Sequence, residues 1–526
     1  MQKPTKKIVI VGGGTAGWIT AGWLAAHHRT HDATSRIEVL LVESPNTPTI
    51  GVGEGTWPTM RNSLIKMGIS ETDFIRECDA TFKQGAKFAK WVDGTQDDFY
   101  YHPLVLPQGF TQQDLAPYWS SQQKQTSLPA GKHSFSNAVC FQESVCEQGL
   151  APKTIRTAEY SDVANYAYHL DAGKFTDFLK RHCIEKLGVT YVPADVVAVN
   201  AHTNGDIASL TTHVDNMPNG DISGDLFVDC TGFSSLLLGK HYQVPFIDCS
   251  DVLFIDTALA VHVPYDDADS PIASHTISTA QDAGWIWDIG LQHRRGVGYV
   301  YASKYTDEAT AMQALADYIG PKFSSLKVRK IPIHSGHRES FWHKNCVAVG
   351  LSAGFLEPLE ASAIVLIELS AQMISEQLPA NREVMDIVAN RFNQTFRYRW
   401  DRIIDFLKLH YVLSQRDDTD FWKDNRDPAT IPDSLKDLLK IWQHRAPADM
   451  DFTSNNEVFP AASYQYVLYG MGFETDFSTT PHMLNDWHTA HKQFAKNEHL
   501  IERALASLPT NRELINKIHQ YGFNDL

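Results

Sequence analysis

The 526-residue chain is poor in the features that mark membrane-spanning, secreted or nucleic-acid-binding proteins. Its apolar runs fall short of the roughly 18 residues that a membrane-spanning helix needs. Lysine and arginine number 46 against 62 aspartates and glutamates, for a net charge of -16. This charge argues against a general binder of nucleic acid or anionic membranes, although a local basic pocket stays open. The apolar run at 8–11 is too short for a signal peptide, so we expect a soluble, cytoplasmic protein.

Cysteine is also scarce, and its spacing carries no metal or redox motif. The seven cysteines are scattered, without a CxxC pair or a Cys/His pair at zinc spacing. Cys140 and Cys146 could be neighbours, but buried free thiols are the expected state. We therefore expect neither disulfides nor a structural metal.

Glycine, in contrast, is concentrated near the start of the chain. A β-branched run at 7–11 predicts a buried strand, and Gly-Gly-Gly-Thr-Ala-Gly follows at 12–17. A helix is expected over 18–28, and a second strand over 37–43. A glycine motif between a strand and a helix, with an acid ending the next strand, is the context of a dinucleotide-binding fingerprint.

Each residue of this fingerprint has an expected role. Gly12 would allow the tight turn, Gly14 would let the backbone approach a pyrophosphate, and Gly17 would let the helix pack closely. Glu43 would accept hydrogen bonds from ribose hydroxyls. A glycine turn without a ligand is the alternative, and the motif does not separate FAD from NAD.

Two later stretches favour FAD. Residues 168–175 lead into an amphipathic helix and a strand at 189–192, and 225–232 is typical of a second nucleotide-facing strand. By itself, the pattern at 225–232 also fits an ordinary strand followed by a turn. The glycine-rich loop 51–56 can bring the backbone close to a flat ring.

An acidic pair stands inside an apolar run at 354–364. Glu357 and Glu360 flank Pro358, and a small-residue turn then leads into an apolar helix. Free N–H groups at a helix N-terminus favour an anion, so this stretch predicts a carboxylate beside an anion site.

Lys83 and His102 are ambiguous from their surroundings alone. Phe74, Cys78 and Phe82 have the spacing of one helical face, and Lys83 falls off it, as an ordinary solvated lysine would. His102 lies in the aromatic run 99–104, which could line an aromatic pocket or simply pack.

Two tryptophans alternate in a predicted strand. Trp285 and Trp287 would share one face, with the partner strand at 296–301. Such a pair belongs to a core more often than to a site.

Taken together, these motifs resemble those of the flavin-dependent tryptophan halogenases. The glycine motif followed by Trp18 resembles that family's GxGxxGW, and Trp285-Ile-Trp-Asp-Ile289 resembles its WxWxIP. The run Phe-Leu-Glu-Pro-Leu-Glu at 355–360 resembles the family's segment that holds the catalytic glutamate and the halide. The run at 81–83 resembles the segment that holds its catalytic lysine. The likeness extends from Gly12 to about Gly472.

The resemblance implies a set of site residues. Lys83 and Glu360 would be catalytic, Ser362 and Ala363 would hold the halide, and His102 with Glu360 would contact the substrate. The implied FAD-binding residues are Gly12, Gly14, Thr15, Ala16, Gly17, Glu43, Gly51, Val52, Val196, Leu351 and Ile364.

Several positions depart from the family pattern. Gly290 stands in place of the motif's proline, and Ala361 and Ala363 flank Ser362 where the family has Ser and Gly. Leu104 and Tyr464 replace familiar aromatic residues of the substrate pocket. A backbone-held halide survives these changes, and the pocket would be wider or shaped for another substrate.

The resemblance also implies the fold and the reaction. We expect an α/β protein with an FAD-dependent monooxygenase-like, Rossmann-type core of mixed sheets over 1–375, with insertions at about 60–165 and 250–335. A mostly helical, substrate-covering region would occupy 376–526. Reduced FAD, oxygen and chloride or bromide would give hypohalous acid, which Lys83 and Glu360 direct onto an indole-like or tryptophan-like substrate.

The implied partners are a small aromatic substrate and a separate flavin reductase, which supplies reduced FAD. Nucleic acid and membrane are not expected as partners, and a homodimer stays open.

Two alternatives keep the fold but change the activity. The first is a flavin monooxygenase whose halide site is spoiled by Ala361 and Ala363. The second is a non-catalytic flavin-binding paralogue.

Overall fold

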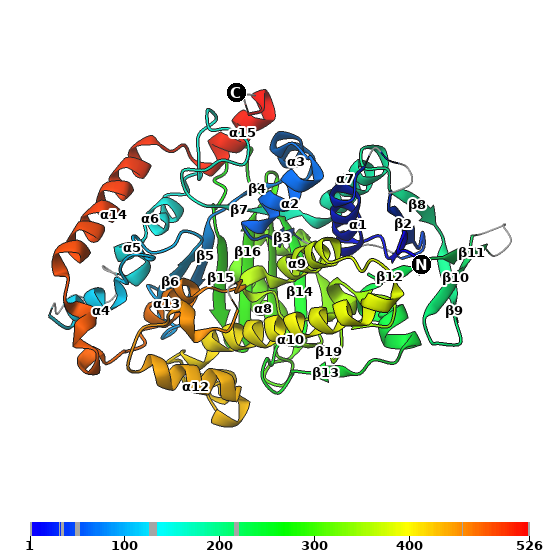
Figure 1. Cartoon of the computed structure of the whole chain (residues 1–526). Coiled ribbons are helices and arrows are strands. Elements are labelled where there is room, and N and C mark those ends of the chain that lie inside the picture. Colours follow the sequence, from blue (N-terminus) through cyan, green and yellow to red (C-terminus); the bar gives the residue numbers. More distant parts are fainter. Residues whose placement is uncertain are drawn as a thin grey trace. The chain divides into compact units, whose positions relative to one another are not determined.

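The computed structural model describes residues 3–30, 32, 36–47, 53–125, 134–214, 220–454 and 456–523 (Figure 1). Its contacts divide the chain into two units, each built from three stretches of sequence. The first unit comprises Met1–Asp79, Leu170–Cys249 and His334–Trp400, and the second comprises Ala80–His169, Ser250–Ile333 and Asp401–Leu526. The α/β class with mixed sheets and the helical C-terminal region are confirmed. The boundary at residue 375 stays a prediction.

A six-stranded sheet forms the centre of the first unit, in the order β20-β21-β12-β1-β2-β8. Its neighbours are parallel except for the β20–β21 pair. Strand β1 is β-branched and buried after Lys7, as a central parallel strand should be. The strands are β20 (Trp342–His343), β21 (Cys346–Ala348), β12 (Leu226–Asp229), β1 (Lys7–Val11), β2 (Glu38–Glu43) and β8 (Thr190–Pro193).

Helix α1 (Thr15–His27) packs against α2 (Thr59–Met67), α7 (Ala172–Glu185) and α9 (Ser362–Glu376). Two three-stranded sheets complete this unit, in the orders β11-β10-β9 and β13-β19-β22. Their strands are β9 (Asp195–Ala201), β10 (Ile207–His213), β11 (Gly220–Ser223), β13 (Phe246–Asp248), β19 (Gly336–Arg338) and β22 (Gly354–Phe355). The short strand β3 spans Gly53–Gly55, and α10 spans Arg382–Val412.

The helical face expected for Phe74, Cys78 and Phe82 is wrong. Helix α3 (Glu71–Glu77) is capped by Ser70, whose side chain accepts a hydrogen bond from the Asp73 N–H, but it ends before Cys78. Asp79 then takes a left-handed conformation with φ 48°, which a continuing helix excludes. Phe82 and Lys83 consequently lie in strand β4 (Thr81–Lys83).

A seven-stranded sheet forms the centre of the second unit, in the order β18-β14-β17-β16-β15-β5-β6. Only the β15–β5 pair is parallel. The predicted pairing of the tryptophan strand with the strand that follows it is confirmed by β16 and β17. The strands are β5 (Gly85–Ala89), β6 (Phe99–Pro103), β14 (Thr257–Pro264), β15 (Thr276–Gln281), β16 (Gly284–Gly290), β17 (Arg294–Tyr301) and β18 (Arg329–Pro332).

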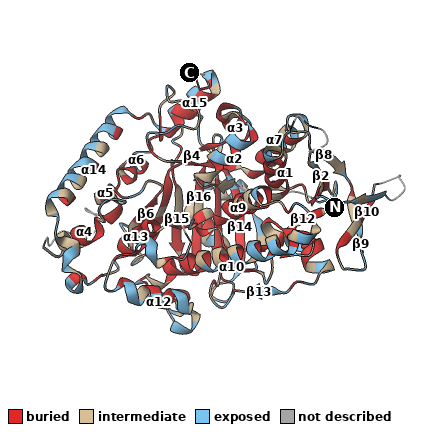
Figure 2. Ribbon diagram, in the orientation of Figure 1, coloured by how far each residue is buried: buried red, intermediate tan, exposed pale blue. Residues whose placement is uncertain are grey.

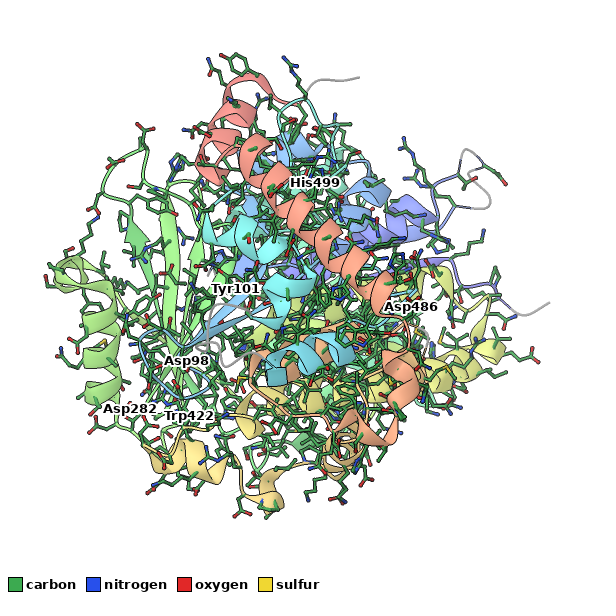
Figure 3. The ribbon with its side chains drawn as sticks, turned by 90° about the vertical axis from the view of Figure 1, so that its left-hand side faces the viewer. Asp98, Tyr101, Asp282, Trp422, Asp486 and His499 are labelled. Atoms are coloured by element: carbon green, nitrogen blue, oxygen red, sulfur yellow. The ribbon has the colours of Figure 1, made fainter. Side chains whose placement is uncertain are left out.

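The helices of this unit are exposed on one side, whereas its sheet is largely buried (Figure 2). Asp486 caps the start of α14 by accepting a hydrogen bond from the Thr489 N–H at 3.0 Å, and His499 lies further along the helix (Figure 3). The helices are α4 (Ala116–Gln125), α5 (Phe135–Val139), α6 (Gln142–Glu147), α8 (Glu308–Ile319), α11 (Asp420–Asp424), α12 (Asp433–Trp442), α13 (Ala461–Gly470), α14 (Trp487–Ser507) and α15 (Asn511–Tyr521).

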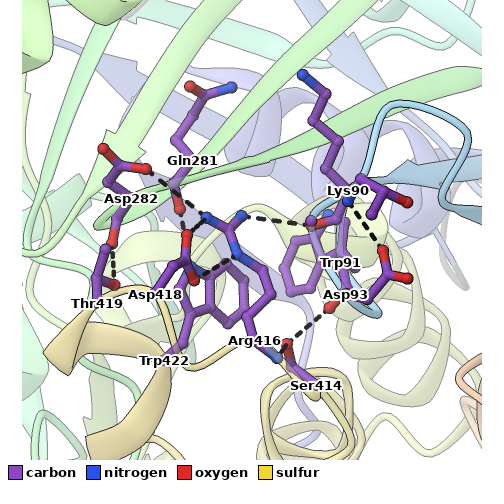
Figure 4. A network of polar contacts seen from close by, with 12 residues as sticks. Lys90, Trp91, Asp93, Gln281, Asp282, Ser414, Arg416, Asp418, Thr419 and Trp422 are labelled. Atoms are coloured by element: carbon purple, nitrogen blue, oxygen red, sulfur yellow. Dashed lines mark hydrogen bonds and ion pairs between the residues drawn. The ribbon is translucent and has the colours of Figure 1, made fainter.

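Arg416 fastens the segment after α10 to the sheet of the second unit (Figure 4). Its guanidinium bonds both oxygens of Asp418, donates to the Lys90 carbonyl at 3.3 Å and lies 4.7 Å from the Trp422 ring. The Trp422 indole in turn donates to the Gln281 carbonyl at 3.0 Å. Two of these contacts go to backbone carbonyls, at the end of β15 and just after β5, and they hold the segment against the sheet.

All seven cysteines are buried free thiols. Across the described ranges, none of the helices is both long and apolar enough to span a bilayer.

The buried carboxyl of Glu368 should make stability depend on pH. Ser63 and Thr59 donate hydrogen bonds to it, yet burial raises its pKa to about 8. The folded state therefore holds a proton that the unfolded state releases, and stability should fall as pH rises from about 5 to 8, by on the order of 3–5 kcal/mol. We expect Glu368→Gln to remove this loss in urea unfolding at a series of pH values.

The matched control is Glu376→Gln, at an exposed position of the same helix. It should leave the pH dependence of the parent protein in place. An unchanged pH profile for Glu368→Gln would contradict the assignment.

Candidate active site

Gly12 and Gly17 bring the start of α1 into direct contact with the backbone of the sheet. Gly12 has φ +115°, and a Cβ there would lie 2.1 Å from the Cys230 carbonyl oxygen. A Cβ at Gly17 would lie 1.9 Å from the Gly12 carbonyl oxygen. Because real Cβ atoms do not approach backbone so closely, neither position admits a side chain.

Gly14, in contrast, faces open space. A Cβ there would meet no protein atom of the described residues within 4 Å. Gly14 is also the N-cap of α1, and no side chain of the described residues caps this end of the helix. Uncapped N–H groups beside open space fit the pyrophosphate of a dinucleotide such as FAD.

Glu43 ends β2 and lies against the glycine turn. A Cβ at Gly13 would lie 2.3 Å from Glu43 Oε1, so the middle glycine makes room for this carboxylate, a role that the fingerprint alone does not reveal. The other oxygen accepts a hydrogen bond from Lys180 Nζ at 2.7 Å. Gly51 and Val52 lie outside the described residues.

Other predicted FAD-binding residues lie around the same turn. Thr15 Oγ1 is 3.1 Å from Thr176 Oγ1. A Cβ at Gly350, next to Leu351, would lie 2.8 Å from the Ala16 Cβ. It would also lie 3.5 Å from the Ile367 side chain, so this segment lies between α1 and α9, the helix that carries Ile364.

Val196 lies on β9 and packs against the apolar cluster that contains Val11 and Val42, the residues just before Gly12 and Glu43. It lines a surface groove of about 240 Å³ together with Leu236 and Lys240. Its role in binding FAD stays a prediction.

The strand predicted within 225–232 is β12, and its acid has an internal role. Asp229 is fully buried and accepts hydrogen bonds from the Leu237 and Leu238 N–H groups, both at 2.8 Å. Its carboxylate therefore fixes the turn after the strand.

The backbone takes a strained path just before α9. Glu360 (φ 65°) and Ala361 (φ 54°) are consecutive non-glycine residues in the left-handed region. Each costs on the order of 1–3 kcal/mol and persists only where the surroundings impose it. The Trp57 indole N–H donates to the Glu360 carbonyl at 2.8 Å and holds this kink.

The predicted helix N-terminus is confirmed, because α9 begins at Ser362. Its N-cap, Ala361, offers no side-chain acceptor, so the first N–H groups are available to an anion. Ala363 lies inside the helix, where alanine in place of the family's glycine costs no backbone strain. Glu360 is 8% exposed, whereas Glu357 is completely buried.

In the second unit, Lys83 is buried rather than solvated. It is only 4% exposed, at the end of β4. Thr81 and Lys83 alternate along β4, and His169 of β7 (Ala167–Asp171) pairs with Thr81. The three side chains therefore share one face of the ladder.

His169 is a neutral neighbour of this lysine. Burial holds the pKa of His169 well below its ordinary value, and the charge of Lys83 lowers that pKa further. Its Nε2 lies 2.9 Å from Thr276 Oγ1. The side chain therefore lines the lysine's surroundings without adding a second positive charge.

The tryptophan strand reaches β4 through Gly290. The Thr81 hydroxyl donates to the Gly290 carbonyl at 2.5 Å. A Cβ at Gly290 would lie 2.8 Å from the Ile272 side chain. The end of this motif therefore contacts the lysine strand directly, an arrangement that local sequence does not reveal.

His102 lies on β6, 3% exposed, with its Nε2 2.9 Å from Ser463 Oγ. Aromatic rings surround it. Phe406 and Phe459 stack at 3.8 Å between centroids, and Tyr464 meets Phe406 edge-on at 4.8 Å. The histidine is thus held by a hydroxyl and surrounded by aromatic rings.

Comparison with known proteins identifies the family. The family model for tryptophan halogenases matches residues 7–484. The chain belongs to the tryptophan halogenase family. A crystal structure of a tryptophan halogenase from Shewanella frigidimarina superimposes with a TM-score of 0.94 and is 49% identical, covering 100% of both chains.

Curated members of the family are more distant in sequence. The tryptophan 7-halogenase RebH of Lentzea aerocolonigenes is 32% identical over 99% of this chain and 100% of its own. The tryptophan 6-halogenase ThaL of Streptomyces albogriseolus is 30% identical over 99% of both. The resemblance seen in the sequence motifs is therefore confirmed, and with it the flavin-dependent halogenase class of enzyme.

Two glycine substitutions should separate folding from cofactor binding in this halogenase. Gly17→Ala places a methyl group against the Gly12 carbonyl and should lower the free energy of unfolding by roughly 2–4 kcal/mol. Gly14→Ala has room in the protein and should change it by less than about 1 kcal/mol. It should nevertheless weaken FAD binding by roughly 10-fold or more, because the methyl group fills the pyrophosphate's place.

Urea unfolding and fluorescence titration with FAD measure the two effects. Unchanged FAD affinity in Gly14→Ala would contradict the placement of the pyrophosphate.

Proposed function

We propose that this chain is an FADH2-dependent halogenase of tryptophan-like indoles. Lys83 delivers the halogen, and Glu360 assists the substitution. The observation that carries the proposal is the burial of Lys83, at 4% exposed, in a member of the halogenase family. A lysine is rarely buried so completely unless it is paired or functional.

The cofactor would bind at the start of α1. Its pyrophosphate would lie beside Gly14, in the turn that Gly12 and Gly17 shape, and Glu43 would bind its ribose. When bound, reduced FAD supplies the reducing power that turns oxygen and a halide into hypohalous acid. The chain has a single glycine fingerprint, so we propose that a separate flavin reductase delivers the reduced cofactor.

Lys83 would act as a hydrogen-bond donor that orients hypohalous acid. The neutral state of His169 favours this role, because a second cation there would oppose a protonated lysine. Glu360 would stabilise the cationic ring formed by electrophilic attack and accept its proton. The halide would be held at the start of α9 by the N–H groups of Ser362 and Ala363.

The substrate would be a flat aromatic molecule, and an indole fits best. The aromatic wall around His102 and Ser463 supports this choice, since stacked rings bind a planar ligand. The names of RebH and ThaL give tryptophan as their substrate. Tryptophan is therefore the first substrate to test.

Lys83→Ala should abolish halogenation while FAD binding is retained. The assay combines FAD, a flavin reductase, NADH, chloride or bromide and tryptophan, with mass spectrometry to detect the halogen isotope doublet. We expect a loss of at least about 100-fold in product. The control is Lys87→Ala on β5, which removes the ion pair of Lys87 with Glu147 of α6 and should stay near the parent rate.

A near-parent rate in Lys83→Ala would contradict its role. A halide-independent, oxygenated product would instead identify a monooxygenase. If reduced flavin is consumed but tryptophan, indole and phenols all stay unmodified, the chain would be a non-catalytic flavin-binding protein.

A further inference from the structure

The strand that carries Lys83 is held by partners from three distant segments. The Thr81 hydroxyl donates to the Gly290 carbonyl at 2.5 Å, and the Gln84 N–H donates to the Ser274 carbonyl at 2.7 Å. The third partner is Asn511, whose side-chain amide donates to the Phe82 carbonyl at 3.2 Å. Each residue flanking Lys83 is therefore hydrogen-bonded outside the β4–β7 ladder.

Asn511 is the first residue of α15 and is completely buried. Its amide also reaches the Ala273 carbonyl at 3.4 Å, so one side chain joins β4 to the segment before β15. A buried amide that bridges two backbone carbonyls fixes their separation, since losing it leaves both carbonyls unsatisfied.

The start of α15 is itself anchored independently of β4. The Asn511 N–H donates to the Gly149 carbonyl at 2.9 Å, and the Ala151 N–H donates to the Pro509 carbonyl at 2.8 Å. Arg512 donates to the Ser270 carbonyl at 2.8 Å and to the Gln292 carbonyl at 2.6 Å. The Asn511 side chain therefore reaches β4 from a helix whose start is fixed by other hydrogen bonds.

We infer that Asn511 is a positioning residue for Lys83, an inference that rests on the proposed role of that lysine. Residue 511 lies beyond the part matched by the family model, which ends at residue 484. The C-terminal helix would therefore contribute to the geometry of the reaction without touching the reacting atoms. A displaced Lys83 should still let hypohalous acid form but should transfer it to the substrate less efficiently.

The test compares Asn511→Ala with Thr510→Ala. Thr510 is exposed and caps α15 through the Glu513 N–H at 3.2 Å, so its loss weakens the same helix without removing a contact to β4. The readout is the ratio of halogenated tryptophan to hypohalous acid caught by a β-diketone trap, together with the melting temperature and the FAD affinity.

We expect Asn511→Ala to lower this ratio by roughly 10-fold or more, at unchanged FAD affinity. Thr510→Ala should lower the melting temperature and keep the parent ratio. If Asn511→Ala does not fold, Asn511→Leu, which is similar in size and has no donor, decides with the same expected loss.

If the folded Asn511 variant keeps the parent protein's ratio of halogenated tryptophan to trapped hypohalous acid while Lys83→Ala abolishes halogenation, the inference about Asn511 is wrong and the proposed function stands. Full activity of Lys83→Ala would instead overturn the proposed function. The two failures are therefore distinguishable.

Discussion

The backbone contact between Gly12 and Gly17 is the constraint on which the cofactor half of the chain depends. Hydrogen atoms in place of two side chains let the start of α1 touch the sheet beside Cys230. Helix α9 packs against α1, and the Gly350 segment lies between them. A side chain at either glycine would displace α1 and, with it, the start of α9. The start of α1, which we assign to the pyrophosphate, and the start of α9, which we assign to the halide, thus belong to one packing arrangement.

The kink at Glu360 and Ala361 is the second constraint. Two left-handed residues cost several kcal/mol together, and the buried apolar side of α9 and the hydrogen bond from Trp57 offset that cost. The kink begins α9 without a side-chain cap. Strain at this position therefore has a function in our account, because it leaves the helix N–H groups to an anion.

Much of the fold was predictable because its signals are local. The glycine turn, the buried strand at 7–11 and the tryptophan strand each depend on neighbouring residues, and the structure confirms all three elements. The sequence pattern failed at Phe82, because the left-handed Asp79 ends α3 and the chain then enters β4. A helical spacing of apolar residues contains no information about such a break.

The surroundings of Lys83 were not predictable, because they are assembled from residues far apart in sequence. His169, Gly290 and Asn511 reach β4 through strand pairing and a C-terminal helix. The residues around Lys83 in the sequence fit an ordinary solvated lysine, and only the family resemblance marked it as catalytic; the structure adds its burial and its distant neighbours. The assignment of individual site residues stays a prediction, whereas the family is established.

We assign to the start of α9 the halide that the reaction consumes. Anomalous diffraction from crystals of the FAD complex soaked in bromide tests this assignment most directly. The account predicts a bromide peak within hydrogen-bonding distance of the Ser362 or Ala363 N–H group. A well-ordered FAD complex with bromide bound elsewhere, or with no peak at this helix terminus, would contradict it.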